Sequence, residues 1–295
     1  HPATLTRFKM RASARSLALL CPLFCRPRGC PLLCAPDSPS ISPTAGATRS
    51  RFGQHQGGRS LGKKKKIRHH VNPLKDVHMQ PLDLPERWPE EGAFTQPDLP
   101  LHVDIGCARG LFCLDLAAES SGSANVLGLE IRSALAEAAA EDARRLGVAN
   151  AAFLPCNANV NLEAVLLRAS RCGPLQSVSI QFPDPWFKAR HKKRRVVQPE
   201  LVETIARHLE PGGWLFFQTD VLDLAQDARD TIRQAAAGTL RDAREDAGDW
   251  AAPKPKPLAC VSTERERSCA ELQRPVYRAV FEKLPAGMPA GHERR

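Results

Sequence analysis

The sequence lacks an apolar run long enough to cross a membrane as a helix. The run LALLCPLF at 17–24 is far shorter than the roughly 20 residues that a transmembrane helix needs, and it contains Pro22. The sequence also lacks the GxxxxGK[ST] loop that holds phosphates in P-loop proteins. We therefore expect neither a membrane protein nor a P-loop nucleotidase.

Acidic residues are almost absent from the first quarter of the chain. Residues 1–75 contain fifteen Lys or Arg and one acid, Asp37, whereas residues 76–295 contain 27 basic and 31 acidic residues. Residues 1–60 are rich in Arg, Ser, Ala and Pro, a composition typical of an organelle transit peptide. We predict a disordered leader over 1–60, with the plastid favoured over the mitochondrion and a cytoplasmic protein as the alternative.

Cysteine spacing does not indicate a metal site or a disulfide framework. Four of the ten cysteines lie in the leader, and they are Cys21, Cys25, Cys30 and Cys34. Their spacing lacks the short knuckle and long loop of a zinc site. The other six are scattered in mostly apolar contexts, which favours free buried thiols. We expect no metal.

Strand-like runs alternate with helical patterns from Leu99 onward. The predicted strands cover 99–105, 125–131, 151–155, 176–182, 214–220 and 274–283, and the predicted helices cover 111–120, 132–147, 161–170, 198–213 and 222–237. This alternation predicts an α/β fold whose mostly parallel sheet is covered by helices on both faces. We assign 61–98 to a basic linker and a segment leading into the domain, 99–284 to the domain, and 285–295 to a disordered tail.

The ends of the first three predicted strands carry candidate cofactor-binding residues. The first strand runs through Asp104 into a turn whose small residues, including Gly106, permit close approach of a ligand. Glu130 ends the second strand, where an acid can accept both ribose hydroxyls of an adenosine. Asn157 follows the third strand and can pair with an adenine edge. The glycine spacing departs from the dinucleotide fingerprint, and the turn alone does not separate dinucleotides from other adenosine cofactors.

A carboxylate between two prolines follows the fourth strand and precedes a cationic run. Pro183 and Pro185 restrict the backbone on either side of Asp184. The run that follows contains Lys188, Arg190, His191, Lys192, Lys193, Arg194 and Arg195. Such runs are often solvated surface, but this one stands on a net negative domain beside an acid, which favours binding of a phosphate backbone. Trp186 and Phe187 either stack on a base or pack under the loop.

These motifs together resemble one family. FPDPWFKARHKKRRVVQPELVETIARHLEPGGWLFFQTD is similar to the signature region of the tRNA (guanine-N7-)-methyltransferases. HVDIGCARG, VLGLEIR and CNAN resemble that family's cofactor elements in order, TERERSCAELQRPVYRAVFEK its C-terminal element, and RHHVNPLKD its N-terminal one. The resemblance covers roughly 67–283, and 1–60 have no counterpart.

The resemblance implies a Rossmann-like class I methyltransferase fold with a seven-stranded sheet. It implies S-adenosyl-L-methionine as methyl donor, S-adenosyl-L-homocysteine as product, and guanine 46 of the tRNA variable loop as acceptor. The implied cofactor residues are Asp104, Gly106, Glu130 and Asn157, and the implied active-site acid is Asp184. The implied tRNA contacts are Lys188, Asp220, Thr263, Glu266 and the stretch 190–195. Ala108 and Asn157 depart from residues common in such enzymes. The sequence leaves open a monomer, a homodimer or a complex with a partner subunit.

The chemistry of guanine N7 limits the role of Asp184. That nitrogen already carries an in-plane lone pair, so attack on a methyl group requires no general base. We expect Asp184 to position the purine or to stabilise its developing positive charge. The alternatives are a non-catalytic RNA-binding module, a methyltransferase with another RNA target or an amino-directed one, and a nicotinamide-dependent oxidoreductase.

Overall fold

The structure is a computed structural model that describes residues 70–244, 248, 250 and 252–285. The leader predicted over 1–60, its four cysteines, the lysine run of the linker and residues 286–295 lie outside the described residues. The transit peptide and its organelle therefore stay predictions. Among the helices of the described part, none is long and apolar enough to cross a membrane.

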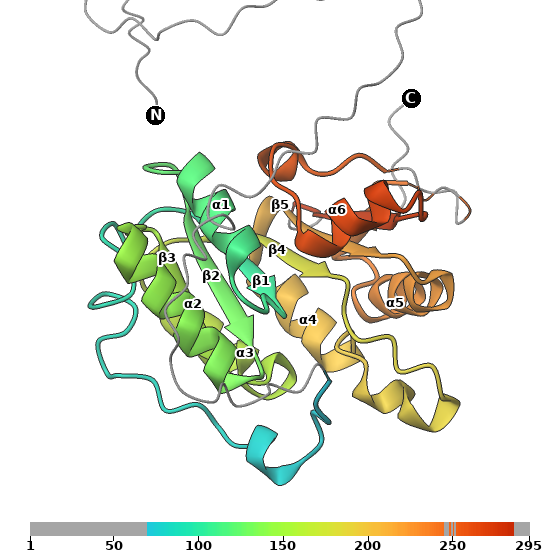
Figure 1. Cartoon of the computed structure of the whole chain (residues 1–295), viewed down its shortest axis with the longest axis horizontal. Coiled ribbons are helices and arrows are strands. Elements are labelled where there is room, and N and C mark those ends of the chain that lie inside the picture. Colours follow the sequence, from blue (N-terminus) through green and yellow to red (C-terminus); the bar gives the residue numbers. More distant parts are fainter. Residues whose placement is uncertain (1–69, 245–247, 249, 251, 286–295) are drawn as a thin grey trace, which may run out of the picture. The chain divides into compact units, whose positions relative to one another are not determined.

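One seven-stranded sheet organises the described residues (Figure 1). Its strands are β1 (Leu101–Ile105), β2 (Asn125–Glu130), β3 (Ala151–Pro155), β4 (Leu175–Gln181), β5 (Leu209–Thr219), β6 (Leu240–Asp242) and β7 (Tyr277–Lys283). They lie in the order β3-β2-β1-β4-β5-β7-β6, and β1 to β5 pair in parallel. β7 runs antiparallel to both β5 and β6. The predicted mostly parallel, seven-stranded sheet is confirmed.

Helices cover both faces of this sheet, as predicted. They are α1 (Leu111–Glu119), α2 (Ser133–Leu146), α3 (Ala158–Ala169), α4 (Pro199–His208), α5 (Leu222–Ala235) and α6 (Glu264–Glu271). Side chains of α3, α4 and α5 pack into one buried cluster, and those of α1 and α2 pack into a second cluster with Leu258 and Val261. All five residues of β1 are buried. Burial on both faces explains why the central strands read as apolar runs and not as alternating patterns.

The largest difference from the predicted boundaries lies between α4 and β5. The helix predicted over 198–213 ends at His208, and Leu209 to Gly213 already belong to β5. Pro211 cannot continue a helix, and a Cβ on Gly213 would lie 2.7 Å from the Gln176 carbonyl oxygen. The residues of β6 and α6 were not predicted as regular elements, because three residues carry no periodicity and α6 is strongly polar.

The strand order reverses beside β1. The chain passes from β1 outward to β2 and β3, and then crosses back to place β4 on the other side of β1. In open parallel sheets, the carboxyl ends of the strands at such a switch point form a crevice for ligands. The topology therefore directs attention to the loops after β1, β2 and β4.

Candidate active site

A cavity of about 380 Å³ lies at this switch point. Its wall contains the four predicted cofactor residues, Asp104, Gly106, Glu130 and Asn157, and the predicted active-site acid Asp184. Thr263 and Arg194 also line it. The volume falls in the range of roughly 300–1,000 Å³ typical of small-molecule sites. Residues as far apart in the sequence as Val71 and Arg265 thus meet at one cavity.

The turn after β1 is built for close ligand approach. Gly106 has a φ of +85°, and a Cβ on it would meet no atom within 4 Å, so the turn is open on that side. Gly110 has a φ of +71°, and its Cβ would lie 2.7 Å from both Ala139 and Phe153. Gly106 therefore leaves space for a ligand, whereas Gly110 allows α1 to pack closely against its neighbours.

Glu130 fastens this turn to the end of β2. Its side chain is 2% exposed, and one carboxylate oxygen accepts hydrogen bonds from the backbone N and Nε of Arg132 at 2.9 and 2.8 Å. The other accepts from the Ala108 backbone N at 2.9 Å and from Arg132 Nη2 at 3.0 Å. A carboxylate has about four lone-pair sites, so these bonds occupy the group fully. Hydrogen bonding to Glu130 also raises the pKa of Arg132.

Asp104 lies at the floor of the cavity and is 4% exposed. Its Oδ1 accepts hydrogen bonds from Ser179 Oγ at 2.5 Å and from Gln181 Nε2 at 3.1 Å, and the Cys113 thiol lies 3.5 Å from Oδ2. Burial raises the pKa of Asp104, and the hydrogen bonds from Ser179, Gln181 and Cys113 oppose that rise. Oδ1 is thus held firmly by two donors, while the only partner of Oδ2 among the described residues is the weakly donating thiol.

Asn157 has a structural role on both sides of its amide. Its Oδ1 accepts from the Asn159 backbone N at 3.1 Å and so caps α3. Its Nδ2 donates to the Pro73 carbonyl oxygen at 3.2 Å, which ties the N-terminal segment to the cavity wall. The predicted contact with an adenine edge stays a prediction.

Asp184 projects from a strained loop at the cavity rim. Phe182 and Trp186 flank it with φ values of +48° and +45°, in the left-handed region that non-glycine residues rarely adopt. The Asp184 side chain is 38% exposed, and its Oδ1 lies 2.6 Å from Nδ1 of His70. Pro183 and Pro185 restrict the backbone next to Asp184, and Phe182 and Trp186 beyond them adopt strained conformations. The backbone that carries this carboxylate is therefore tightly constrained.

The cationic run divides into anchoring and exposed residues. The Arg195 side chain is 1% exposed and binds Asp223 at 2.6 Å, Asp227 at 2.8 Å and the Pro185 carbonyl oxygen at 2.9 Å. Lys192 shares Asp227 at 3.1 Å. The structure thus places Arg195 under the loop, where it fastens the loop to α5. Its predicted tRNA contact stays a prediction. Lys188, Arg190, Lys192 and Lys193 are all exposed, and of these four Lys192 alone has an ion pair within the described residues, with Asp227.

The two aromatic residues of this loop behave differently. Trp186 packs edge-on against His191 at 5.7 Å, and the Arg194 guanidinium lies 5.0 Å from its ring centre. Phe187 is 74% exposed. Trp186 therefore packs within the loop, whereas the exposed ring of Phe187 is available for stacking on a base.

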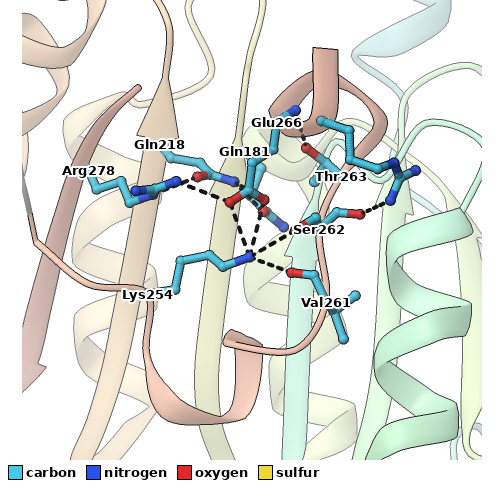
Figure 2. A network of polar contacts seen from close by, with 9 residues as sticks. Gln181, Gln218, Lys254, Val261, Ser262, Thr263, Glu266 and Arg278 are labelled. Carbon is cyan, nitrogen blue, oxygen red and sulfur yellow. Dashed lines mark hydrogen bonds and ion pairs between the residues drawn. The ribbon is translucent and has the colours of Figure 1, made fainter. Parts of the chain in front are cut away.

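The remaining candidates gather around α6: Thr263 and Glu266 belong to its first turn, and Asp220 follows β5. Thr263 caps the helix by accepting from the Glu266 backbone N at 3.1 Å. Asp220 pairs with Arg265, which lines the cavity. Glu266 is 9% exposed and binds Lys254 and Arg278, so its carboxylate is turned into the protein. Figure 2 shows the side chains of Lys254 and Arg278 directed toward Glu266. Its predicted tRNA contact stays a prediction.

Comparison with known proteins agrees with this geometry. Residues 98–279 match a family described as "Putative methyltransferase". A tRNA (guanine-N(7)-)-methyltransferase of Synechococcus sp. strain CC9311 is 46% identical over 76% of this chain and 90% of its own. Those of Nostoc sp. strain PCC 7120 (45%, 74% of this chain and 94% of its own) and Synechocystis sp. strain PCC 6803 (44%, 75% and 98%) are similar. The chain belongs to the tRNA (guanine-N(7)-)-methyltransferase family.

Sequence reasoning missed three residues that shape the site of this family member. Arg132 closes over Glu130, His70 contacts Asp184, and Gln181 holds Asp104. Of these three contacts, only the one between Glu130 and Arg132 had a local signal in the sequence, because the two residues are two positions apart at a strand end. Ala108, one of the two departures noted in the sequence, has a φ of +50°, where alanine costs about 1 kcal/mol more than glycine.

The division of the cationic run predicts different effects on stability. Arg195→Met should lower the free energy of unfolding by about 2 kcal/mol, because it removes charge-assisted hydrogen bonds to Asp223 and Asp227. Lys193→Met, at an exposed position of the same run, should change it by less than about 0.5 kcal/mol. Urea denaturation measures both, and equal effects would contradict the anchoring role.

Proposed function

We propose that this protein transfers a methyl group from S-adenosyl-L-methionine to N7 of guanine in tRNA, at position 46 of the variable loop. The observation that carries the proposal is the single cavity in which Glu130 and Asp104 meet Asp184 beside a cationic loop. The names of the curated relatives support the same reaction. S-adenosyl-L-homocysteine is the product, and no metal takes part in the proposed reaction.

The residues of the cavity fit this cofactor. Bound there, S-adenosyl-L-methionine supplies an electrophilic methyl group on a positively charged sulfur. The open side of Gly106 leaves room for a ligand against the backbone, and Asp104 presents a carboxylate of complementary charge. The lone-pair sites of Glu130 are already filled. To accept hydrogen bonds from the ribose hydroxyls, Glu130 would therefore release the two bonds from the Arg132 side chain.

Asp184 acts on the acceptor without removing a proton. The N7 lone pair is available as it stands, and methylation leaves positive charge on the purine. A carboxylate held at the cavity rim stabilises that charge, and it can also accept hydrogen bonds from the guanine edge. The strained, proline-flanked loop restricts the carboxylate, which lowers the cost of orienting it in the transition state.

The exposed part of the cationic loop provides the RNA-binding surface. Lys188, Arg190 and Lys193 are placed to neutralise phosphates, and Phe187 offers an exposed ring for stacking on an unpaired base. A non-catalytic RNA-binding module would use the same surface. The preserved cavity and its carboxylates favour an enzyme.

The reaction itself is tested with unmodified tRNA and S-adenosyl-L-methionine labelled in the methyl group. We expect label on one N7-methylguanosine, at position 46, and none on a tRNA carrying adenine there. Mapping by aniline cleavage and mass spectrometry locates it. Label on another guanine would correct the position, and RNA binding without any label would favour the non-catalytic module.

Asp184→Asn tests the role of the active-site acid. Turnover should fall by about two orders of magnitude because the amide cannot stabilise positive charge as a carboxylate does. The dissociation constants for tRNA and S-adenosyl-L-methionine should stay within about threefold, since the rest of the cavity is unchanged. Asp230→Asn, at an exposed position on α5, is the control. Near-normal turnover of the Asp184 variant would refute the assignment.

Salt dependence tests the RNA surface. Replacing Lys188, Arg190 or Lys193 singly by Met should each reduce the slope of log K against log salt by about 1 for tRNA binding. Lys192→Met should change the slope less, because Asp227 already neutralises this lysine. Filter binding at several salt concentrations measures the slopes. Equal changes at all four positions would mean that the ion pair with Asp227 does not reduce the contribution of Lys192 to RNA binding.

A further inference from the structure

A continuous chain of hydrogen bonds joins α6 to Asp104 in the cavity wall. Figure 2 shows its part from Glu266 and Arg278 to Gln181. Gln181 Nε2 donates to Asp104 Oδ1 at 3.1 Å, and Gln218 Nε2 donates to Gln181 Oε1 at 2.8 Å. Gln218 Nε2 also lies 3.5 Å from Glu266 Oε2, and Arg278 Nε donates to Gln218 Oε1 at 3.2 Å. The chain therefore crosses β4, β5 and β7 and ends on a carboxylate that lines the cavity.

Charged groups at one end of this chain determine how both amides are turned. A glutamine amide donates at one end and accepts at the other, so each can be placed in two ways. Arg278 can only donate, and the Glu266 carboxylate accepts from Lys254 and Arg278. Gln218 is therefore oriented with its oxygen toward the guanidinium. The Gln218 NH2 group then points at Gln181 Oε1, and this leaves the Gln181 NH2 group facing Asp104.

The anchor of the chain is itself fixed. Lys254 Nζ lies 3.1 and 3.2 Å from the two carboxylate oxygens of Glu266, and Arg278 Nη2 lies 3.1 Å from Oε1. The same ammonium group donates to the Val261 carbonyl oxygen and to Ser262 Oγ. The side chains of Lys254 and Glu266 are each 11% exposed. Two cations thus hold the Glu266 carboxylate in place through charge-assisted hydrogen bonds.

We propose that Gln218, oriented by Arg278 and Glu266, is a positioning residue for cofactor binding, because it turns the Gln181 amide so that Asp104 is held as an ionised acceptor facing the cavity. This inference rests on the proposed function, since it takes S-adenosyl-L-methionine as the cofactor. It also gives Glu266 a role through the cofactor site in addition to the tRNA contact that the family resemblance implies.

The groups around Asp104 define the consequence for pH. Ser179 and Gln181 donate to it from β4, the Cys113 thiol faces it from α1, and Glu130 contributes a like charge from β2. Burial raises the pKa of Asp104, so losing the Gln181 donor should raise it further. A positively charged cofactor favours the ionised carboxylate. On acidification, the affinity of a variant without the Gln181 donor for S-adenosyl-L-methionine should therefore begin to fall at a higher pH than that of the wild type.

Neighbouring groups do not obscure this titration. His102 contacts Ser179 behind Asp104, and burial lowers the pKa of His102 to about 3, so it stays neutral in the range to be measured. Burial raises the pKa of Cys113 well above its usual value, so this thiol also stays neutral. The Cys107 thiol beside them has a raised pKa as well.

The experiment measures S-adenosyl-L-methionine binding by calorimetry across roughly pH 5 to 9 with the full chain and variants of it. Gln218→Met should weaken binding by about five- to tenfold at pH 7 and shift the midpoint of the pH dependence upward by about one pH unit. Gln181→Met should do the same. Gln176→Met, at an exposed position on the same strand as Gln181, should leave both unchanged.

A double variant separates positioning from a general loss of structure. If Gln218 acts through Gln181, the Gln181→Met and Gln218→Met double variant should match the Gln181→Met single variant in affinity and midpoint. Additive losses, or weaker binding with an unshifted midpoint, would refute the proposal. If Gln218→Met does not fold, Arg278→Met takes its place, with a smaller shift expected in the same direction. Wild-type protein that fails to bind the cofactor would instead refute the proposed function.

Discussion

Parallel pairing of β1 with β2 on one side and β4 on the other is the constraint on which the site depends. In this register Asp104 lies beside Gly128 of β2 and Ser179 of β4, so the three strands end at the same edge of the sheet. Their loops then deliver Gly106, Glu130 and Asp184 to one cavity. Glycine at 128 belongs to the same constraint, because a Cβ there would lie 2.6 Å from Phe153 and 2.7 Å from Cys107.

The carboxylates at this edge are stabilised in different ways. Glu130 forms an ion pair with Arg132 and accepts a hydrogen bond from the Ala108 backbone N–H. It thereby joins the loop after β1 to the end of β2. Within the described part of the chain, the side-chain donors to Asp104 are the neutral groups of Ser179, Gln181 and Cys113. A carboxylate held by neutral donors keeps its net negative charge, which suits a positively charged ligand. The far cations of the network, Lys254 and Arg278, act on Glu266 and reach Asp104 through the two glutamines.

The loop after β4 shows how one basic segment serves two purposes. Arg195 forms ion pairs with Asp223 and Asp227 of α5, and Trp186 packs against Arg194 and His191. This interior packing supports the strained backbone at Phe182 and Trp186 and leaves Lys188, Arg190, Lys193 and Phe187 outward. Anchored and exposed cations are adjacent in sequence because the 3-10 helix at 189–194 turns successive side chains in different directions.

The sequence by itself determined the α/β class and the order of the main strands and helices, and it predicted residues that meet at one cavity, Gly106 and Asp184 among them. Each of these is encoded locally: apolar runs such as 125–131 form strands, small residues permit the turn at Gly106, and prolines frame Asp184. The short β6 and the polar α6 escaped prediction, because neither has a hydrophobic period.

Only the tertiary structure decided which charges are available. No local pattern distinguishes Arg195 from Lys193, or marks Glu266 as buried beneath two cations. These roles depend on partners more than ten positions away, on α5 and β7, that folding brings into contact. Periodicity records which face of an element is apolar, whereas pairing of buried polar groups depends on the distances between elements.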